Sequence, residues 1–192
     1  EPGYEDSLEG RATSEGISVR EALMDAMADG RPILYLFGDY EYTVQPQFDF
    51  ISREQSVFGL SDGGAHVGVL CDASVPTYML AYATRDRHKG PQLPIEFVVH
   101  KMSQDTALVY GFTDRGVIAE GYKADVNVID YDKVRLHDPE MVFDLPSGGK
   151  RLIQKADGYT ATICGGVVTY ENGIHTGEMP GRLIRGGQIE TV

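Results

Sequence analysis

Near the N-terminus, the hydrophobic positions repeat with the spacing of an α-helix. Apolar side chains after Ser18 recur at every third or fourth position, which places them on one helical face. Ser18 and Glu21 have the spacing of a capping box, in which each side chain bonds the backbone amide of the other residue. Gly30 is suited to a helix C-terminus. The pattern predicts a helix over residues 19–29.

A different pattern follows, in which short apolar runs flank a mixed segment. The runs over 32–37 and 57–60 are short and end at glycine or acidic residues, which is typical of buried strands. Residues 47–54 between them have apolar positions that suit a helix. The order helix, strand, helix, strand indicates the parallel crossovers of an α/β protein.

Helical spacing returns in the middle of the chain. Residues 76–83 predict a helix, and Pro94 suits the first position of another. Ser103 suits the cap of a third helix, which would end at Gly111. We therefore expect three helices between residues 76 and 111.

From Gly116 onward, the apolar residues alternate with period two, as they do in half-buried strands. The segments with this pattern are 117–118, 124–129 and 160–163. The pairs Gly165-Gly166 and Asn172-Gly173 are signals for tight hairpin turns. This part of the chain is therefore predicted to be β-rich.

The charge balance restricts the partners of the protein. Its 192 residues include 17 Lys+Arg and 29 Asp+Glu, which gives a net charge of −12. Such an acidic surface disfavours nucleic acid and anionic membranes, and no apolar run approaches the roughly 20 residues that span a bilayer. We expect a cytoplasmic protein. Cys71 and Cys164 are expected to be free thiols, with a disulfide between them as the alternative.

The segment that ends at His66 carries the strongest candidate chemistry. Its apolar run stops at Asp62, which is therefore expected at the C-terminal edge of a strand, where parallel α/β proteins place their active sites. Gly63 and Gly64 allow a sharp turn or a close approach to a ligand, and His66 is a candidate ligand or substrate contact. An aspartate at such a junction also commonly caps the next turn, and a histidine there can be an ordinary loop residue.

Other catalytic motifs are absent from the sequence. The five histidines form no His-x-His or His-Glu-x-x-His pair, so their spacing predicts no self-contained zinc site. No serine lies in a Gly-x-Ser-x-Gly elbow, and the glycine pair after Asp62 is not followed by the Gly-Lys-Ser/Thr of a phosphate loop.

Several segments together resemble the metal-dependent amidohydrolase superfamily. Residues 116–130, Gly-Val-Ile-Ala-Glu-Gly-Tyr-Lys-Ala-Asp-Val-Asn-Val-Ile-Asp, resemble the segment with which that family leaves a catalytic barrel and enters a small β-sandwich. Residues 59–66, Gly-Leu-Ser-Asp-Gly-Gly-Ala-His, resemble the end of barrel strand eight. Residues 162–168 and 171–177 resemble the closing hairpin. Within the superfamily, the chain is most similar to the N-acyl-D-amino-acid deacylases, or D-aminoacylases.

The resemblance implies an α/β fold that is the C-terminal portion of a TIM-barrel metal-dependent hydrolase. Residues 1–115 would form the last βα units of the barrel, and residues 116–192 would form strands of a small β-sandwich and a tail. Family members are longer and hold their metal with a His-x-His motif on earlier strands. We therefore expect this chain to be part of a longer hydrolase and inactive by itself. A partial barrel exposes strand edges, which favours self-association.

The resemblance also implies roles for individual residues. Zinc, held mostly by residues outside this sequence, would supply an acidified water and polarise the acyl carbonyl. Asp62 would take the proton of that water and pass it to the leaving nitrogen, and it could also contact the metal. Gly63, Gly64 and His66 would lie against the substrate, a small molecule similar to an N-acyl amino acid. The reaction would be the deacylation of a linear amide.

Two alternatives are compatible with the same residues. One is hydrolysis of a cyclic amide, as in dihydroorotases and hydantoinases. The other is a non-catalytic binding or assembly module that keeps the barrel end and the sandwich as a scaffold. A His-x-His motif encoded upstream of Glu1 would favour an enzyme, whereas a start codon at that point would favour the module.

Overall fold

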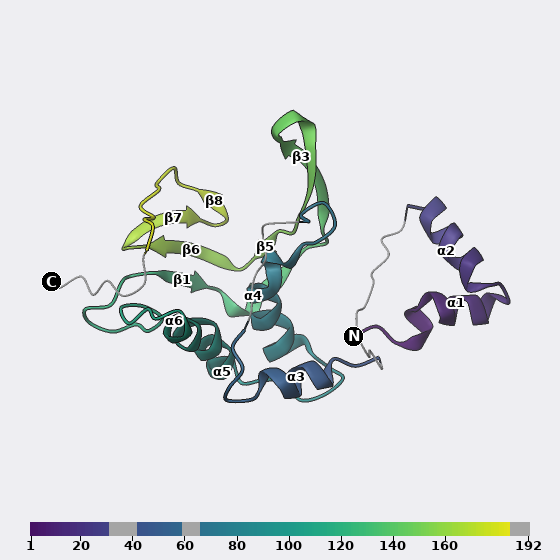
Figure 1. The fold of residues 1–192 in the computed structure, drawn as a ribbon, viewed down its shortest axis with the longest axis horizontal. Helices are drawn as coiled ribbons and strands as arrows, with labels where there is room; N and C mark the ends of the chain where they lie inside the picture. The colour runs from purple at the N-terminus through teal and green to yellow at the C-terminus, as the bar shows by residue number, and fades with distance from the viewer. Residues whose placement is uncertain (31–41, 59–65, 185–192) are drawn as a thin grey trace. The chain divides into compact units, whose positions relative to one another are not determined.

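The structure, a computed structural model, describes residues 1–30, 42–58 and 66–184 (Figure 1). The chain divides into two compact units, Glu1–Ser56 and Val57–Val192. The described part of the first unit is helical, whereas the second combines helices with antiparallel strands. The division expected between residues 115 and 116 stays a prediction.

The first unit contains a 3-10 turn and several helices. Their bounds are Tyr4–Asp6 for the 3-10 turn, Leu8–Glu15 for α1, Val19–Ala28 for α2 and Gln45–Ile51 for α3. At the start of α2, the Glu21 amide donates to Ser18 Oγ at 3.2 Å, and the Ser18 amide donates to the Glu21 carboxylate at 2.8 Å. The predicted capping box and the helix over 19–29 are confirmed. The helix expected over 47–54 is present as α3, displaced toward the N-terminus.

In the second unit, two helical segments precede the strands. The first joins a 3-10 turn, Asp72–Ser74, to α4, Val75–Tyr78, and to a π-helical stretch, Met79–Asp86. The second joins α5, Ile95–His100, to a π-helical stretch, Lys101–Asp105, and to α6, Thr106–Val109. The helix predicted over 76–83 is confirmed. Pro94 was expected at the first helical position and is instead the N-cap residue of α5, one position earlier.

Ser103 does not begin a third helix, contrary to the prediction. It lies within the second helical segment, where its Oγ donates to the Val99 carbonyl at 2.5 Å. A serine that bonds the carbonyl four residues earlier can remain inside a helix, so a cap-forming residue type did not mark a boundary here. Gly111 ends the segment as expected, with φ of 75° and a bond of 2.8 Å from the Phe112 amide to the Ala107 carbonyl.

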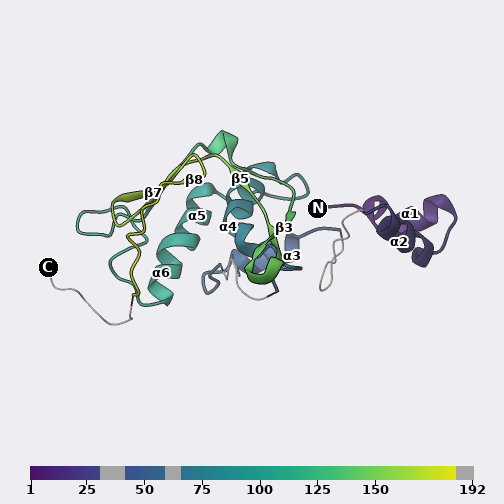
Figure 2. The same cartoon turned by 90° about the horizontal axis from the view of Figure 1, so that it is seen from above.

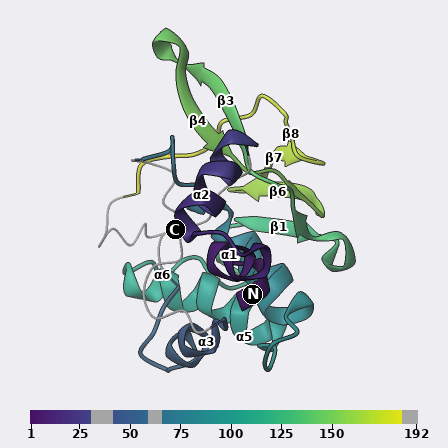
Figure 3. The same cartoon turned by 90° about the vertical axis from the view of Figure 1, so that its right-hand side faces the viewer.

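In the described part of the second unit, the strands pair in three small sheets. Their bounds are Val126–Ile129 for β1, Arg135–Leu136 for β2, Glu140–Leu145 for β3, Gly149–Ile153 for β4, Ala156–Asp157 for β5, Tyr159–Cys164 for β6, Val167–Glu171 for β7 and Ile174–His175 for β8. The sheets have the orders β1-β6-β7-β8, β2-β5 and β3-β4, and every pair is antiparallel. Short 3-10 turns at Tyr131–Lys133 and Pro146–Gly148 connect neighbouring strands. The β3–β4 hairpin extends away from α5 and α6 (Figures 1 and 3).

The predicted hairpins are confirmed. Gly165 and Gly166 connect β6 to β7, and Asn172 and Gly173 connect β7 to β8. All four residues have positive φ, which is the conformation that tight hairpin turns of this kind require. The strand predicted over 124–129 is also present, as β1.

The strand predicted over 117–118 is wrong. Gly116 and Gly121 have φ of 86° and 82°, and the Lys123 amide donates to the Asp114 carbonyl at 2.7 Å, so this segment closes into a loop. Ile118 exposes 88% of its surface to solvent. The apolar pair therefore lies in the connection that leads to β1.

The predicted parallel crossovers concern residues that are largely outside the described ranges. Residues 32–37 are outside them, and of the run over 57–60 only Val57 and Phe58 are described, neither of them in a strand. All strand pairs in the described part of the chain are antiparallel. The barrel portion and the β-sandwich stay predictions.

Side-chain hydrogen bonds join the first helical segment to the strand region. Thr77 Oγ1 lies 2.8 Å from the Tyr159 hydroxyl, and Thr84 Oγ1 lies 2.7 Å from the Tyr131 hydroxyl. Each unit has buried apolar side chains of its own. They are Ala12, Ala22, Ala26 and Phe48 in the first unit, and Met79, Leu80, Ala81, Ala83, Val98, Ala107 and Val134 in the second. Figure 2 shows α4, α5 and α6 of the second unit from above.

Candidate functional site

The structure describes one of the predicted site residues. Asp62, Gly63 and Gly64 lie outside the described ranges, and their roles stay predictions. His66 is described and exposed, and its φ of 60° is in the left-handed region. Its carbonyl accepts from the amides of Val69 and Leu70 at 2.8 and 2.9 Å. His66 thus begins a tight turn at the end of the segment over 59–66, while its side-chain role stays a prediction.

The loop after His66 is attached to β4 through its backbone. The Leu152 amide donates to the Val67 carbonyl at 2.6 Å. A Cβ added at Gly68 would lie 3.8 Å from Lys150 Cε, so the next residue of the loop packs beside the same strand. The β3–β4 hairpin therefore supports the loop at its first residues.

The end of this loop is attached through side chains. Ser74 Oγ lies 2.5 Å from Gln154 Oε1 and 3.0 Å from the Cys71 carbonyl, so the shorter of its two contacts is with the glutamine. Gln154 Nε2 in turn donates to the His137 carbonyl at 2.8 Å. Sequence patterns did not identify Gln154, because its partners lie far from it along the chain.

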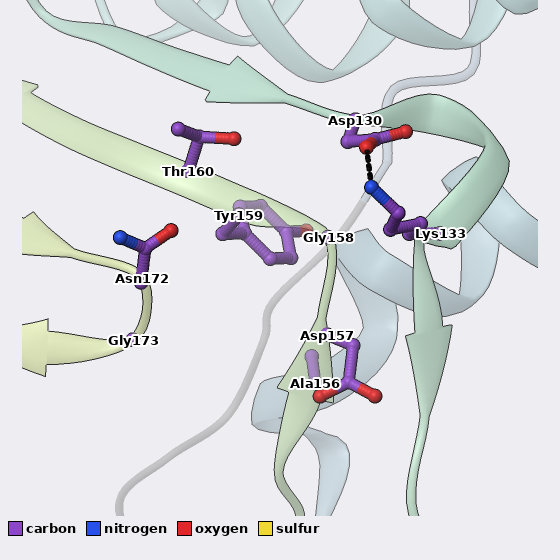
Figure 4. A pocket seen from close by; sticks show the side chains of 9 residues that line it. All are labelled: Asp130, Lys133, Ala156, Asp157, Gly158, Tyr159, Thr160, Asn172 and Gly173. Carbon is purple, nitrogen blue, oxygen red and sulfur yellow. Dashed lines mark hydrogen bonds and ion pairs between the residues drawn. The ribbon is translucent and has the colours of Figure 1, made fainter.

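A polar recess lies at the junction of β5, β6 and the turn after β7. This pocket has a volume of about 210 Å³, and its lining residues are Asp130, Lys133, Ala156, Asp157, Gly158, Tyr159, Thr160, Asn172 and Gly173 (Figure 4). Figure 4 shows Asp130 paired with Lys133, while Asp157 lies apart from them on β5.

Both carboxylates of the pocket have cationic or histidine partners. Lys133 Nζ lies 2.6 Å from Asp130 and lowers the pKa of that carboxyl group. Asp157 lies 3.0 Å from His137 Nε2 and 2.7 Å from Arg135 Nε, and these hydrogen bonds lower its pKa. The pocket therefore presents paired charges. Such pairs stabilise the ionised carboxylates and lower their affinity for protons. A general acid requires the opposite, a carboxyl group with raised proton affinity.

The described residues do not form a metal centre by themselves. Across residues 1–30, 42–58 and 66–184, no three side chains of the His, Cys, Asp or Glu type come together in a way that could hold a metal ion. Cys71 and Cys164 are free thiols, as expected. Burial and, to a smaller extent, the charge of Asp72 raise the pKa of Cys71. In the same part of the chain, no helix is long and apolar enough to cross a membrane.

A family model now identifies the class of the protein. Residues 30–170 match the Amidohydrolase family, so the chain belongs to it. The matched range includes 59–66 and 116–130, two of the segments on which the resemblance rests. The protein is therefore a member of the metal-dependent amidohydrolase superfamily, a group of hydrolases. Comparison with curated proteins and with solved structures gave no match.

Proposed function

We propose that this chain carries the proton-transferring residue of a zinc-dependent hydrolase that deacylates N-acyl-D-amino acids. The observation that carries the proposal is the family match over residues 30–170, which includes the segment with Asp62, Gly63, Gly64 and His66. The D-aminoacylase assignment within the family is supported by the likeness of the segments over 59–66 and 116–130. A cytoplasmic location is a prediction from the acidic composition.

In this proposal, Asp62 moves one proton during each turnover. A carboxylate can accept the proton of the attacking water and then, as an acid, give it to the departing nitrogen. The Gly63-Gly64 pair has no side chains, so the backbone can come close to the acyl group. His66 follows in a fixed turn and is proposed to contact the substrate.

Zinc in this family supplies Lewis-acid chemistry at the scissile amide. The described residues do not fit such an ion by themselves, since no three suitable ligands converge among them. In this proposal the remaining ligands come from outside the described ranges, with Asp62 as one further candidate. Metal analysis of the intact protein, with and without chelation and zinc restoration, tests this part directly.

The central prediction concerns Asp62→Asn in the intact protein. The amide cannot act as a base, so we expect kcat on N-acetyl-D-amino acids to fall by about 10²–10⁴-fold, with a smaller effect on KM. Gln104→Leu, which changes a residue of the second helical segment, is the control and should keep normal kinetics. Near-normal turnover by Asp62→Asn would refute the proton-transfer role.

The substrate panel of the same assay separates the alternatives. Turnover of hydantoins or dihydroorotate, with none of N-acyl amino acids, would assign the site to cyclic amides. Because residues 1–192 contain no His-x-His motif, we expect this polypeptide alone to be inactive even with added zinc. Absence of hydrolysis across the panel by the intact, metal-loaded protein would favour the non-catalytic module.

A further inference from the structure

The turn between β7 and β8 places an asparagine directly before a glycine at the surface. Asn172 and Gly173 are both exposed, and their φ angles are 48° and 78°. In such a pair, the glycine nitrogen can attack the side-chain carbonyl carbon of the asparagine, because glycine has no side chain to obstruct the approach. The turn therefore carries the two groups that spontaneous loss of an asparagine amide requires.

The surroundings of the turn leave these groups accessible. A Cβ added at Gly173 would meet no atom within 4 Å. Asn172 is one of the residues that line the polar recess, and Figure 4 shows no hydrogen bond or ion pair between it and the other residues of this recess. Its side chain can therefore turn toward the backbone without breaking a contact in the recess.

The strand after the turn is weakly held. β8 has two residues at one edge of the four-stranded sheet, and Glu171 pairs with Ile174 beside the turn. Ile174 is exposed, so few buried contacts oppose local opening. At the base of the turn, the Asn172 amide donates to the Thr160 carbonyl at 2.9 Å, and this bond can persist while residues 172 and 173 rearrange. The hairpin can therefore admit the reaction without unfolding.

A second pair in the recess shows the opposite arrangement. Asp157 precedes Gly158 and could close the same kind of ring. Its carboxylate lies 3.0 Å from His137 Nε2 and 2.7 Å from Arg135 Nε, and these hydrogen bonds lower its pKa. An ionised and fixed carboxylate is a poor target for the attacking nitrogen. A neutral amide such as that of Asn172 carries no charge that protects it in this way.

We propose that Asn172 is a site of spontaneous modification, at which ring closure with Gly173 produces aspartate and isoaspartate, and that the isoaspartate form releases β8 from β7. The Gly173 nitrogen forms a bond to Asn172 Cγ, and the side-chain nitrogen leaves as ammonia with the proton of the main-chain amide. Solvent water then opens the cyclic imide. If the new bond to Cγ breaks, the product is aspartate. If the original peptide bond breaks, the product is isoaspartate.

Both products alter their surroundings. Each adds a negative charge to a recess that already contains Asp130 and Asp157. Isoaspartate also directs the main chain through the side chain of residue 172, which lengthens the backbone between Glu171 and Ile174 and breaks their register. None of these steps involves a catalytic residue, so the modification does not depend on the proposed function.

Peptide mapping by mass spectrometry, after incubation of the intact protein at neutral pH, tests the modification. We expect Asn172 to convert at most about tenfold more slowly than in a free peptide of residues 167–177, the factor that corresponds to about one hydrogen bond of opening cost. Asn127 is the control in the same molecule, because it lies within β1, pairs with Thr162 on β6 and precedes a valine. It should stay intact. Conversion of the free peptide, with Asn172 unchanged in the protein, would overturn the proposal.

Asn172→Gly is the matched variant for the change in charge. Glycine keeps the positive-φ turn and has no side-chain amide to lose. On ion exchange, the wild-type protein should gain a more acidic form during the incubation, whereas this variant should not. An equal gain in both proteins would show that the charge arises elsewhere and would overturn the assignment to Asn172.

Hydrogen exchange tests the release of β8. The isoaspartate form, separated by ion exchange, is compared with freshly purified Asn172→Asp, which has the added charge on a main chain of unchanged length. We expect the amide of Ile174 to exchange about five- to tenfold faster in the isoaspartate form, because its pairing with Glu171 is lost. Equal exchange rates in the two proteins would contradict the release of β8.

Discussion

At the scale of single residues, Gly158 combines a left-handed backbone conformation with close contact to a neighbouring backbone. It lies between β5 and β6 with φ of 94°, and a Cβ there would lie 2.7 Å from the Cα and the amide nitrogen of Val134. Val134 is fully buried, and the contact is with its backbone, so the neighbour has little room to move. Both the conformation and the space exclude a side chain.

We predict that Gly158→Ala lowers the free energy of unfolding by about 2–4 kcal/mol, as strain and overpacking combine. Gly121→Ala is the matched control, because its φ of 82° is similar but no atom lies within 4 Å of its Cβ position. It should cost about 1 kcal/mol. Urea denaturation of both variants gives the comparison. Equal losses would mean that contact with Val134 contributes nothing.

Local bonding at single residues was largely predictable, whereas tertiary bonding was not. The capping box of Ser18 and Glu21 depends on residues three apart, so its spacing could be recognised in the sequence. Ser74 and Gln154 show the opposite case, since the fold alone brings them together. Asp62 was identified from the end of an apolar run, and its placement stays a prediction.

At the scale of elements, Arg85 connects the first helical segment to the chain after β1. Its guanidinium donates to the Tyr131 carbonyl at 2.5 Å and to the Val134 carbonyl at 2.6 Å, and it lies 5.5 Å from the centre of the Tyr131 ring. Asp86 lies 2.6 Å from the same group and is the main cause of the raised pKa of Arg85. A planar group with several donors can satisfy all of these contacts at once.

We predict that Arg85→Lys lowers the free energy of unfolding by about 1–3 kcal/mol, because an ammonium group cannot reach two carbonyls and a carboxylate in the same geometry. Arg151→Lys is the control. Arg151 pairs with Asp144 on the more exposed β3–β4 hairpin, and exposed pairs contribute about 0–1 kcal/mol. Thermal unfolding followed by circular dichroism distinguishes the two. A loss in Arg85→Lys no larger than the control would contradict a special role for this arginine.

Hydrophobic periodicity predicted the elements correctly where the pattern extended over enough residues. The helices at 19–28 and 75–86 and the β6–β7 hairpin agree with the patterns that predicted them. The pattern failed where only two apolar residues carried it, at 117–118. It predicted no strands between residues 135 and 157, because proline and glycine residues interrupt the alternation there.

At the scale of the whole molecule, two features have opposite effects on self-association. Exposed apolar side chains favour it, and the net charge of −12 disfavours it. The four-stranded sheet ends at β1 and β8, and Ile174 on β8 is 74% exposed. Unpaired strand edges with apolar side chains promote association, while like charge resists it.

We predict that residues 1–192 self-associate, and more strongly at high salt, where charge repulsion is screened. Ile174→Lys should weaken the association, because a lysine on an edge strand disfavours pairing. Ile118→Lys adds the same charge in a loop at a residue that is 88% exposed, and it should have less effect. Sedimentation velocity over a range of concentrations measures both. A monomer at every concentration would contradict the prediction.

The attachment of the loop over 67–74 to residues 152–154 also has a consequence for protein engineering. A truncation after residue 148 would retain every proposed catalytic residue of this chain, and yet it would remove both anchors of the loop. The same holds for a split gene divided near residue 116, whose first product would carry the loop over 67–74 and whose second would carry the anchors of that loop. A shortened version that keeps both anchors of this loop must therefore extend through Gln154.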